Sequence, residues 1–144
     1  MLGKIGTCNN AGLVLSLMAS KCSPILAYNL EALSLPKSTL SHLCYVYSAI
    51  YSKLFKTFDK TIIAMSQCQL QFGYLPLVFE LDLKRLNFLH KLSLTEESPA
   101  SLLFNLVAKD DLTKINTKYG IKNEDSLSER RQAIWNAFRS SLNA

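Results

Sequence analysis

Residues 37–55 read KSTLSHLCYVYSAIYSKLF, and the fold class follows most directly from this stretch. Its apolar positions recur every three or four residues, which places them on one face of an α-helix: Leu40, Leu43, Tyr47, Ile50 and Leu54. Ser38 is a residue type that caps helix N-termini. Lys53 and Lys56 fall in the last turn, where cations interact favourably with the helix dipole. The stretch therefore predicts a helix over residues 37–55 with one apolar face.

Working outward, the same spacing and the placement of Pro and Gly predict further helices over residues 11–21, 25–33, 59–71, 77–92, 99–108, 112–119 and from 126 onward. Suitable N-cap residues precede several of them: Asp59, Ser98, Asp111 and Ser126. Pro24 either interrupts the first helix or begins the next, and Leu35-Pro36 ends the second. Gly73 and Gly120 are suited to helix C-termini.

Residues 75–83 are ambiguous. Leucines and Phe79 alternate there with other residues at a spacing close to that of a β-strand. Apolar residues then continue to Leu92 at helical spacing, which favours a helix over residues 77–92. With a length of 144 residues, the chain is expected to be one mainly α domain. We expect an irregular bundle of about six to seven helices and no substantial sheet.

Composition leaves two interpretations open. Apolar residues make up 49% of the chain and charged residues 19%, which is enough for a core. The apolar excess indicates either a compact helical core with some exposed leucines or a surface that a partner covers. The net charge of +5 lies entirely in residues 1–95, because residues 96–144 carry seven charges of each sign. A basic segment favours phosphate-rich partners, although charge alone identifies none.

Cysteine spacing argues against a metal site. Cys8, Cys22, Cys44 and Cys68 include no ligand pair two to four residues apart, so we expect no bound metal and no cofactor. Reduced thiols in an intracellular helical protein are favoured over two disulfides in a secreted one. The apolar run at residues 11–19 is too short to span a bilayer, but it has the length of a signal-peptide core. A secreted four-cysteine protein therefore stays an alternative.

No catalytic motif is recognisable. The sequence contains no glycine-rich phosphate loop and no nucleophile elbow, and nothing in it indicates a small-molecule substrate. Asp110 and Asp111 superficially match the paired aspartates with which polymerases hold two metal ions. Helical sequence surrounds the pair where a β-hairpin would be required, so helix capping explains them better. We expect no enzymatic activity.

Several phrases, in order, resemble the C-terminal part of non-LTR (LINE-type) retrotransposon reverse transcriptases. The longest is residues 21–33, KCSPILAYNLEAL, against the family pattern Lys-Cys-x-Pro-Ile-Leu-x-Tyr-Gly-x-Glu-Ala-Leu. Shorter matches lie at residues 2–6, 14–17, 37–40, 53–56, 68–69, 72–76 and 85–89, so the resemblance covers about residues 1–92. Two departures are Asn29 in place of the usual Gly and Ala27 in place of a larger aliphatic residue.

The resemblance implies a non-catalytic fragment that lies downstream of the polymerase active site. Residues 1–95 would form a thumb-like, post-catalytic helical region, and residues 96–144 a helical extension packed on the same domain. A thumb lays basic helices along a primer–template duplex, which implies sequence-independent contacts to RNA or an RNA–DNA hybrid. The missing polymerase domains, acting in trans, are the other implied partner. By this analogy the candidate nucleic-acid-binding residues are Lys53, Lys56, Lys60, Lys84, Arg85 and Lys91.

Two rival interpretations stay open at this point. The chain can instead be a small helical protein-interaction module with no role in nucleic-acid binding, or the secreted four-cysteine protein considered above. The aromatic residues Tyr45, Tyr47, Tyr51, Phe55 and Phe58 would suit base stacking, but their spacing is more typical of helix packing.

Overall fold

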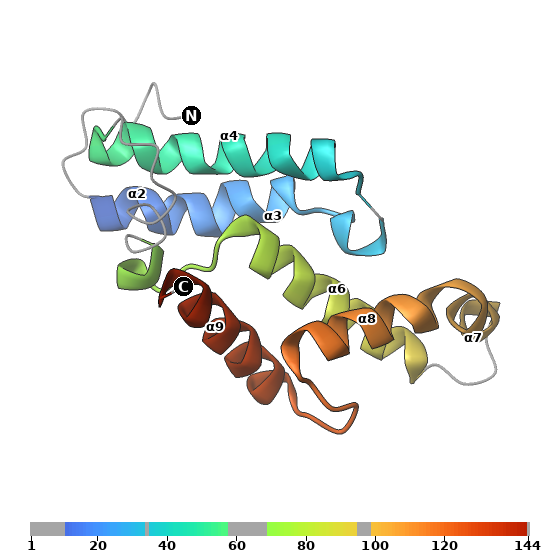
Figure 1. Ribbon diagram of the computed structural model, residues 1–144. Coiled ribbons are helices and arrows are strands. Elements are labelled where there is room, and N and C mark those ends of the chain that lie inside the picture. Colours follow the sequence, from blue (N-terminus) through green and yellow to red (C-terminus); the bar gives the residue numbers. More distant parts are fainter. Residues whose placement is uncertain (1–10, 34, 58–68, 95–98, 144) are drawn as a thin grey trace. The chain divides into compact units, whose positions relative to one another are not determined.

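The computed structural model describes residues 11–33, 35–57, 69–94 and 99–143 (Figure 1). Within these ranges the chain forms seven α-helices and no β-strand. The prediction of a mainly α fold with six to seven helices is thereby confirmed. The ambiguous stretch is a helix, α6, Leu77–Ser93, and not a strand.

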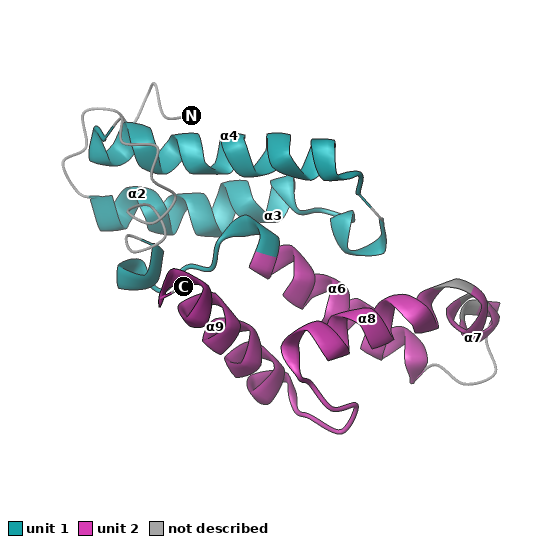
Figure 2. Cartoon of the chain, in the orientation of Figure 1, with its two compact units in different colours: residues 1–78 teal, residues 79–144 magenta. Residues whose placement is uncertain are grey.

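The chain divides into two compact units, residues 1–78 and residues 79–144 (Figure 2). Charge follows this division. Unit 1 contains six lysines against Glu31 and Asp59, a net charge of +4, whereas unit 2 contains ten basic and nine acidic residues, a net charge of +1. The resemblance implied a different boundary, between a thumb-like region at residues 1–95 and a helical extension at residues 96–144. That boundary stays a prediction.

Unit 1 begins with a continuous right-handed helical path. It comprises α2, Ala11–Leu17, a π-helical segment, Met18–Cys22, and α3, Ser23–Leu26. Pro24 lies in the first turn of α3, within this continuous path, so it does not break the helical course of the chain. The expected helix over residues 25–33 is wrong. It ends at Leu26, and only a short 3-10 segment, Leu30–Ala32, follows.

Asn29 explains why the chain turns there. Its φ is 57°, in the left-handed region, which breaks the right-handed helical path. Most residues lose about 1–2 kcal/mol in this conformation, whereas glycine adopts it freely and asparagine tolerates it. The structure thus places an asparagine at a position that glycine suits best.

Asn29→Gly should leave the fold intact and raise the free energy of unfolding by about 0.5–1 kcal/mol, because glycine relieves left-handed strain. Asn29→Ala should lower it by about 1 kcal/mol for the opposite reason. Urea unfolding of both variants measures the difference. Equal stability for the alanine and glycine variants would show that residue 29 is not left-handed.

The next helix, α4, Lys37–Phe55, has the bounds that the sequence predicted. Its N-cap is Pro36, without a side-chain cap, so the assignment of Ser38 as N-cap is wrong. The predicted apolar face is turned inward, with Tyr47 and Tyr51 fully buried and their ring centroids 5.7 Å apart. Burial is the largest cause that raises the pKa of Tyr51, and the neighbouring Tyr47 adds to it.

Unit 1 continues with a helical turn at residues 69–72 that Gly73 ends with a φ of 75°. Gly73 therefore stops the helix as predicted. The expected start of that helix at Asp59 lies outside the described residues. The Phe72 ring stacks on Phe55 of α4, with centroids 5.9 Å apart, and joins the turn to that helix.

Unit 2 is built from the greater part of α6 and the three helices that follow. They are α7, Pro99–Leu103, α8, Lys109–Tyr119, and α9, Leu127–Asn143. A π-helical segment, Phe104–Ala108, joins α7 to α8. The predicted helix over residues 99–108 is therefore confirmed, and Gly120 ends α8 with a φ of 64°. Ser98, the expected N-cap of the helix over residues 99–108, lies outside the described residues.

The core of unit 2 is largely aromatic. Phe79 of α6 lies 5.2 Å from Phe138 of α9 and 6.4 Å from Tyr119 of α8, measured between ring centroids. Ile134 and Phe138 are fully buried on the inner side of α9. Leu127 and Arg131, on the same helix, are exposed.

Polar contacts reinforce the α6–α8 pair. Asp82 of α6 accepts hydrogen bonds from the Tyr119 hydroxyl at 2.5 Å and from the Lys118 ammonium at 2.6 Å. Burial raises the pKa of Tyr119 well above its ordinary value, and the hydrogen bond and the charge of Asp82 act in the same direction. Tyr119 therefore stays a neutral donor in the folded chain.

Ser126 is the N-cap of α9, as predicted, and it forms a capping box with Glu129. The Ser126 N–H donates to the Glu129 carboxylate at 2.7 Å, and the Glu129 N–H donates to the Ser126 hydroxyl at 3.4 Å. The hydrogen bonds from the Ser126 side chain and backbone lower the pKa of Glu129. Because the folded-state pKa is lowered, this stabilisation is present above the ordinary pKa of glutamate and is lost as the pH falls through the lowered value.

We expect the amide protons of Ser126 and Glu129 to be protected from exchange at neutral pH and to lose protection on acidification. In Glu129→Ala the Ser126 amide should be unprotected at every pH, because its acceptor is gone. Amide hydrogen exchange followed by NMR measures both. Equal Ser126 protection in the two proteins would contradict the capping box.

Candidate nucleic-acid interface

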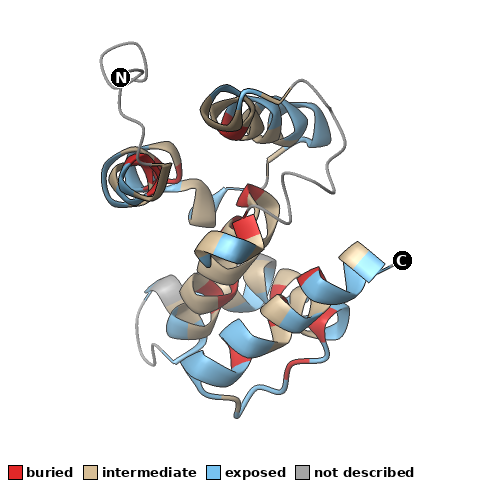
Figure 3. Cartoon of the chain, turned by 90° about the vertical axis from the view of Figure 1, so that its left-hand side faces the viewer, coloured by how far each residue is buried: buried red, intermediate tan, exposed pale blue. Residues whose placement is uncertain are grey.

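The outward side of α4 carries mainly polar residues. The buried residues of α4, Tyr47 and Tyr51, lie one helical turn apart on one side of the helix, and exposed positions lie on the other (Figure 3). Exposed positions opposite the buried tyrosines include Ser38, Ser41, His42, Tyr45, Val46 and Lys53, which carry mainly hydroxyl, imidazole, phenol and ammonium groups. We call these residues, together with Lys56, the α4 face.

Neither α4 nor its C-cap residue, Lys56, contributes an acidic side chain. The sequence contains none between Glu31 and Asp59, so α4 and the residue that caps it carry positive charge only. Counterions gather along such a surface, and a polyanion that displaces them gains free energy. The α4 face is therefore electrostatically suited to a phosphate backbone.

Lys53 and Lys56 lie together at the C-terminal end of α4. Both are exposed, and Lys56 is the C-cap residue with a left-handed φ of 50°. The backbone N–H groups of Lys56 and Thr57 both donate to the Ser52 carbonyl, which closes the last turn. The backbone thus fixes where the Lys56 side chain leaves the helix, one turn beyond Lys53.

The other sequence-predicted residues do not share this position. Lys60 lies outside the described residues. Lys84, Arg85 and Lys91 are on α6, in unit 2. The Lys84 ammonium lies 3.7 Å from the Glu80 carboxylate, a half-exposed pair one helical turn apart, and Lys91 is exposed in the last turn. Of the six, the structure therefore brings together on α4 only Lys53 and Lys56.

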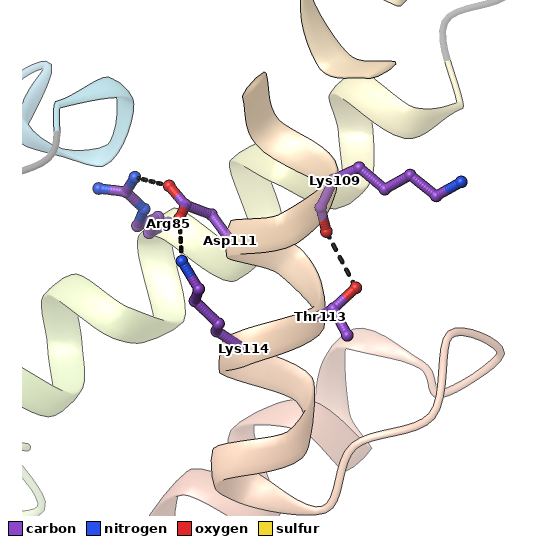
Figure 4. Close-up of polar contacts among 5 residues, drawn as sticks. All are labelled: Arg85, Lys109, Asp111, Thr113 and Lys114. Atoms are coloured by element: carbon purple, nitrogen blue, oxygen red, sulfur yellow. Dashed lines mark hydrogen bonds and ion pairs between the residues drawn. The ribbon is translucent and has the colours of Figure 1, made fainter. Parts of the chain in front are cut away.

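Arg85 holds two helices of unit 2 together. Its guanidinium donates to the Asp111 carboxylate of α8 at 2.6 Å, and the Lys114 ammonium lies 3.7 Å from the other oxygen of that carboxylate (Figure 4). Both Arg85 and Asp111 are half-buried. A phosphate would have to compete with this pair, so the contact favours a structural role for Arg85.

The same contact corrects the interpretation of Asp111. Asp111 was expected to cap a helix at residues 112–119, but α8 already begins at Lys109, and Asp111 lies inside its first turn. Asp110 is exposed in that turn. Both carboxylates lie near the positive end of the helix dipole, and Asp111 additionally neutralises Arg85.

The aromatic residues of α4 separate into two groups. Tyr47 and Tyr51 are buried, and Phe55 is half-buried against Phe72, which agrees with the packing interpretation for these three. Tyr45 differs, because 71% of its surface is exposed. Phe58 lies outside the described residues. Sequence reasoning grouped Tyr45 with the core residues, although its position opposite the predicted apolar face was a signal that could have separated it.

Other kinds of site find little support in the described ranges. No three His, Cys, Asp or Glu side chains gather there as a metal ion would require. Of the helices described, none combines the length and apolar character needed to cross a membrane. Cys22 and Cys44 are thiols, and burial raises the pKa of the Cys44 thiol, so it is a weak nucleophile.

Comparison with known proteins adds no relative. No protein-family model, no curated protein and no solved structure matches the chain.

Proposed function

We propose that this chain is a non-catalytic, nucleic-acid-binding segment from the C-terminal part of a LINE-type reverse transcriptase. The observation that carries the binding function is the α4 face, a set of hydroxyl and ammonium groups to which neither α4 nor its C-cap adds a carboxylate. Lysines neutralise backbone phosphates without reading bases, so the binding is sequence-independent.

The turn at Asn29 supports the proposed origin. The family pattern has glycine at this position, and here the residue is left-handed with a φ of 57°. A glycine is replaced at least cost by asparagine where a left-handed conformation must be kept. The departure from the family pattern is therefore one that the backbone tolerates, and it does not argue against the resemblance.

Under this proposal the candidate residues contribute unequally to nucleic-acid binding. Lys53 and Lys56 are the primary contacts, because they are exposed on the same end of one helix. Lys84 and Lys91 are secondary contacts, and Arg85 serves the α6–α8 packing. Reversing the charge of Arg85 would leave Asp111 without its closest cation, so that substitution tests stability and binding at once.

Filter binding of the purified chain to RNA, DNA and RNA–DNA hybrid tests the function. We expect measurable affinity at low salt that is independent of base sequence and falls as salt rises. Primer extension should yield no product with any metal ion. Absence of binding to every nucleic acid at low salt would exclude the proposed function, and templated synthesis would exclude the non-catalytic assignment.

A protein-interaction module is the second candidate, and exposed leucines of unit 2 favour it. Leu94, Leu102 and Leu106 are all exposed, Leu106 to 82% of its surface. Leu102 and Leu106 lie one helical turn apart. If this surface binds a second copy of the chain, sedimentation should show association that Leu102→Ser with Leu106→Ser removes. If the chain is a monomer at all concentrations, this surface does not bind a second copy of the chain.

A further inference from the structure

We infer that the α4 face takes single-stranded nucleic acid, with Tyr45 stacking on a base while Lys53 and Lys56 neutralise phosphates. This inference rests on the proposed function and specifies its ligand. The observation behind it is the exposure of Tyr45, an aromatic ring placed outside the core on the same side of α4 as the lysines.

The spacing along α4 suits an extended strand. Tyr45 precedes Lys53 by eight residues, which corresponds to about 12 Å along the helix axis, and Lys56 lies about one turn further. Ser41 and His42 lie about one turn on the other side of Tyr45 and are exposed. A strand that crosses Tyr45 can therefore reach both lysines at one end and polar groups at the other.

The exposed ring discriminates between single strands and duplexes. Bases in a duplex are stacked on one another, so their faces do not reach a side chain outside the helix. Bases in a single strand are accessible, and stacking on an aromatic side chain contributes about 1–3 kcal/mol per base whatever the sequence.

Charge decides between nucleic acid and an ordinary apolar protein partner. A helix docking on Tyr45 and Val46 through apolar contacts alone would gain nothing from the neighbouring lysines. All charged residues of α4 and its C-cap are basic, which favours a polyanion as the ligand. An exposed aromatic ring with lysines further along the same helix is the combination of groups that single-strand binding proteins use.

The test compares Tyr45→Ala, Tyr45→Phe and a matched control, Tyr28→Ala. Tyr28 is also in unit 1 and is 75% exposed, but it lies in the turn after α3. Probes are labelled single strands of about 12 nucleotides, as RNA and as DNA, and duplexes of the same length, because single-strand sites cover roughly 4–16 nucleotides. Affinities are measured by fluorescence anisotropy at one fixed salt concentration.

Tyr45→Ala should weaken single-strand binding about tenfold and leave duplex binding unchanged within twofold. Tyr45→Phe, which keeps the ring, and Tyr28→Ala should both match the unsubstituted chain. The slope of affinity against salt should not change, because Tyr45 carries no charge. RNA and DNA single strands should respond alike, since stacking does not depend on the sugar.

Three results would overturn the inference while leaving the proposed function standing. One is tighter binding of duplexes than of single strands. Another is an unchanged single-strand affinity in Tyr45→Ala. The third concerns a poly-glutamate peptide as an additional probe. If Tyr45→Ala loses as much affinity for this peptide as for single strands, the α4 face would be assigned to acidic proteins. Absence of binding to every nucleic-acid probe would instead exclude the proposed function itself.

Discussion

Lys53→Glu combined with Lys56→Glu should weaken single-strand binding by roughly 60-fold at about 50 mM salt. Each phosphate neutralised in a single strand contributes about 0.7 to the slope of log affinity against log salt. One such interaction therefore makes the affinity at about 50 mM salt about eightfold higher than at 1 M. Removing both lysine–phosphate interactions gives the expected factor, and repulsion from the new carboxylates adds to it. Filter binding with one labelled strand measures the change.

A matched control is available in unit 2. Lys109→Glu with Lys122→Glu makes the same change in net charge at two exposed positions outside the α4 face. The side chain of Lys109 extends away from the Arg85–Asp111 pair (Figure 4). We expect this control to lose no more than about threefold in affinity, because neither lysine belongs to the α4 face and only the general effect of net charge is left. Equal losses in both variants would show that total charge and not the α4 face governs binding.

Lys56→Gly separates binding from stability. Glycine relieves the left-handed conformation of residue 56 and should raise the free energy of unfolding by about 0.5–1 kcal/mol. The same substitution removes one ammonium group and should weaken binding. A variant that is more stable and binds less tightly cannot owe its lost affinity to unfolding.

Phe138→Ala should lower the free energy of unfolding of unit 2 by about 3–5 kcal/mol. The Phe138 ring is 2% exposed and lies against Phe79 of α6 and Trp135 of α9, with centroid distances of 5.2 Å and 6.1 Å. Its removal forfeits the transfer free energy of a large ring and leaves a cavity between helices. Urea unfolding followed by tryptophan fluorescence reports on this region, because Trp135 is the single tryptophan.

Leu127→Ala is the control for this substitution. Leu127 lies on the same helix but is 61% exposed, so its truncation should change the free energy of unfolding by no more than about 0.5 kcal/mol. A small loss for Phe138→Ala, similar to that of Leu127→Ala, would contradict the aromatic core of unit 2.

Helix positions could be predicted where local signals agreed with burial. The 3-4 spacing of leucines and tyrosines predicted α4 with its bounds, because the residues that satisfy helical periodicity are buried or half-buried on one side of the helix. Gly73 and Gly120 ended helices as expected, since glycine alone adopts their positive φ without strain. The capping box at Ser126 is likewise a local pattern that the structure keeps.

Contacts between distant residues could not be predicted. Arg85 and Asp111 are 26 residues apart, and no local pattern indicates that they pair. This tertiary contact gave Arg85 a role other than the expected phosphate contact and Asp111 a role other than capping. Asn29 was identified as a departure from the family pattern, but only the backbone angle shows why helix α3 does not continue past it.

The salt dependence of binding tests the account most directly. For single strands, the slope of log affinity against log salt should become shallower by about 1.4 in Lys53→Gln with Lys56→Gln, because two phosphate interactions of about 0.7 each are removed. The Lys109→Gln with Lys122→Gln variant should keep the original slope. An unchanged slope in the α4 variant would contradict the assignment of the α4 face as the surface that binds nucleic acid.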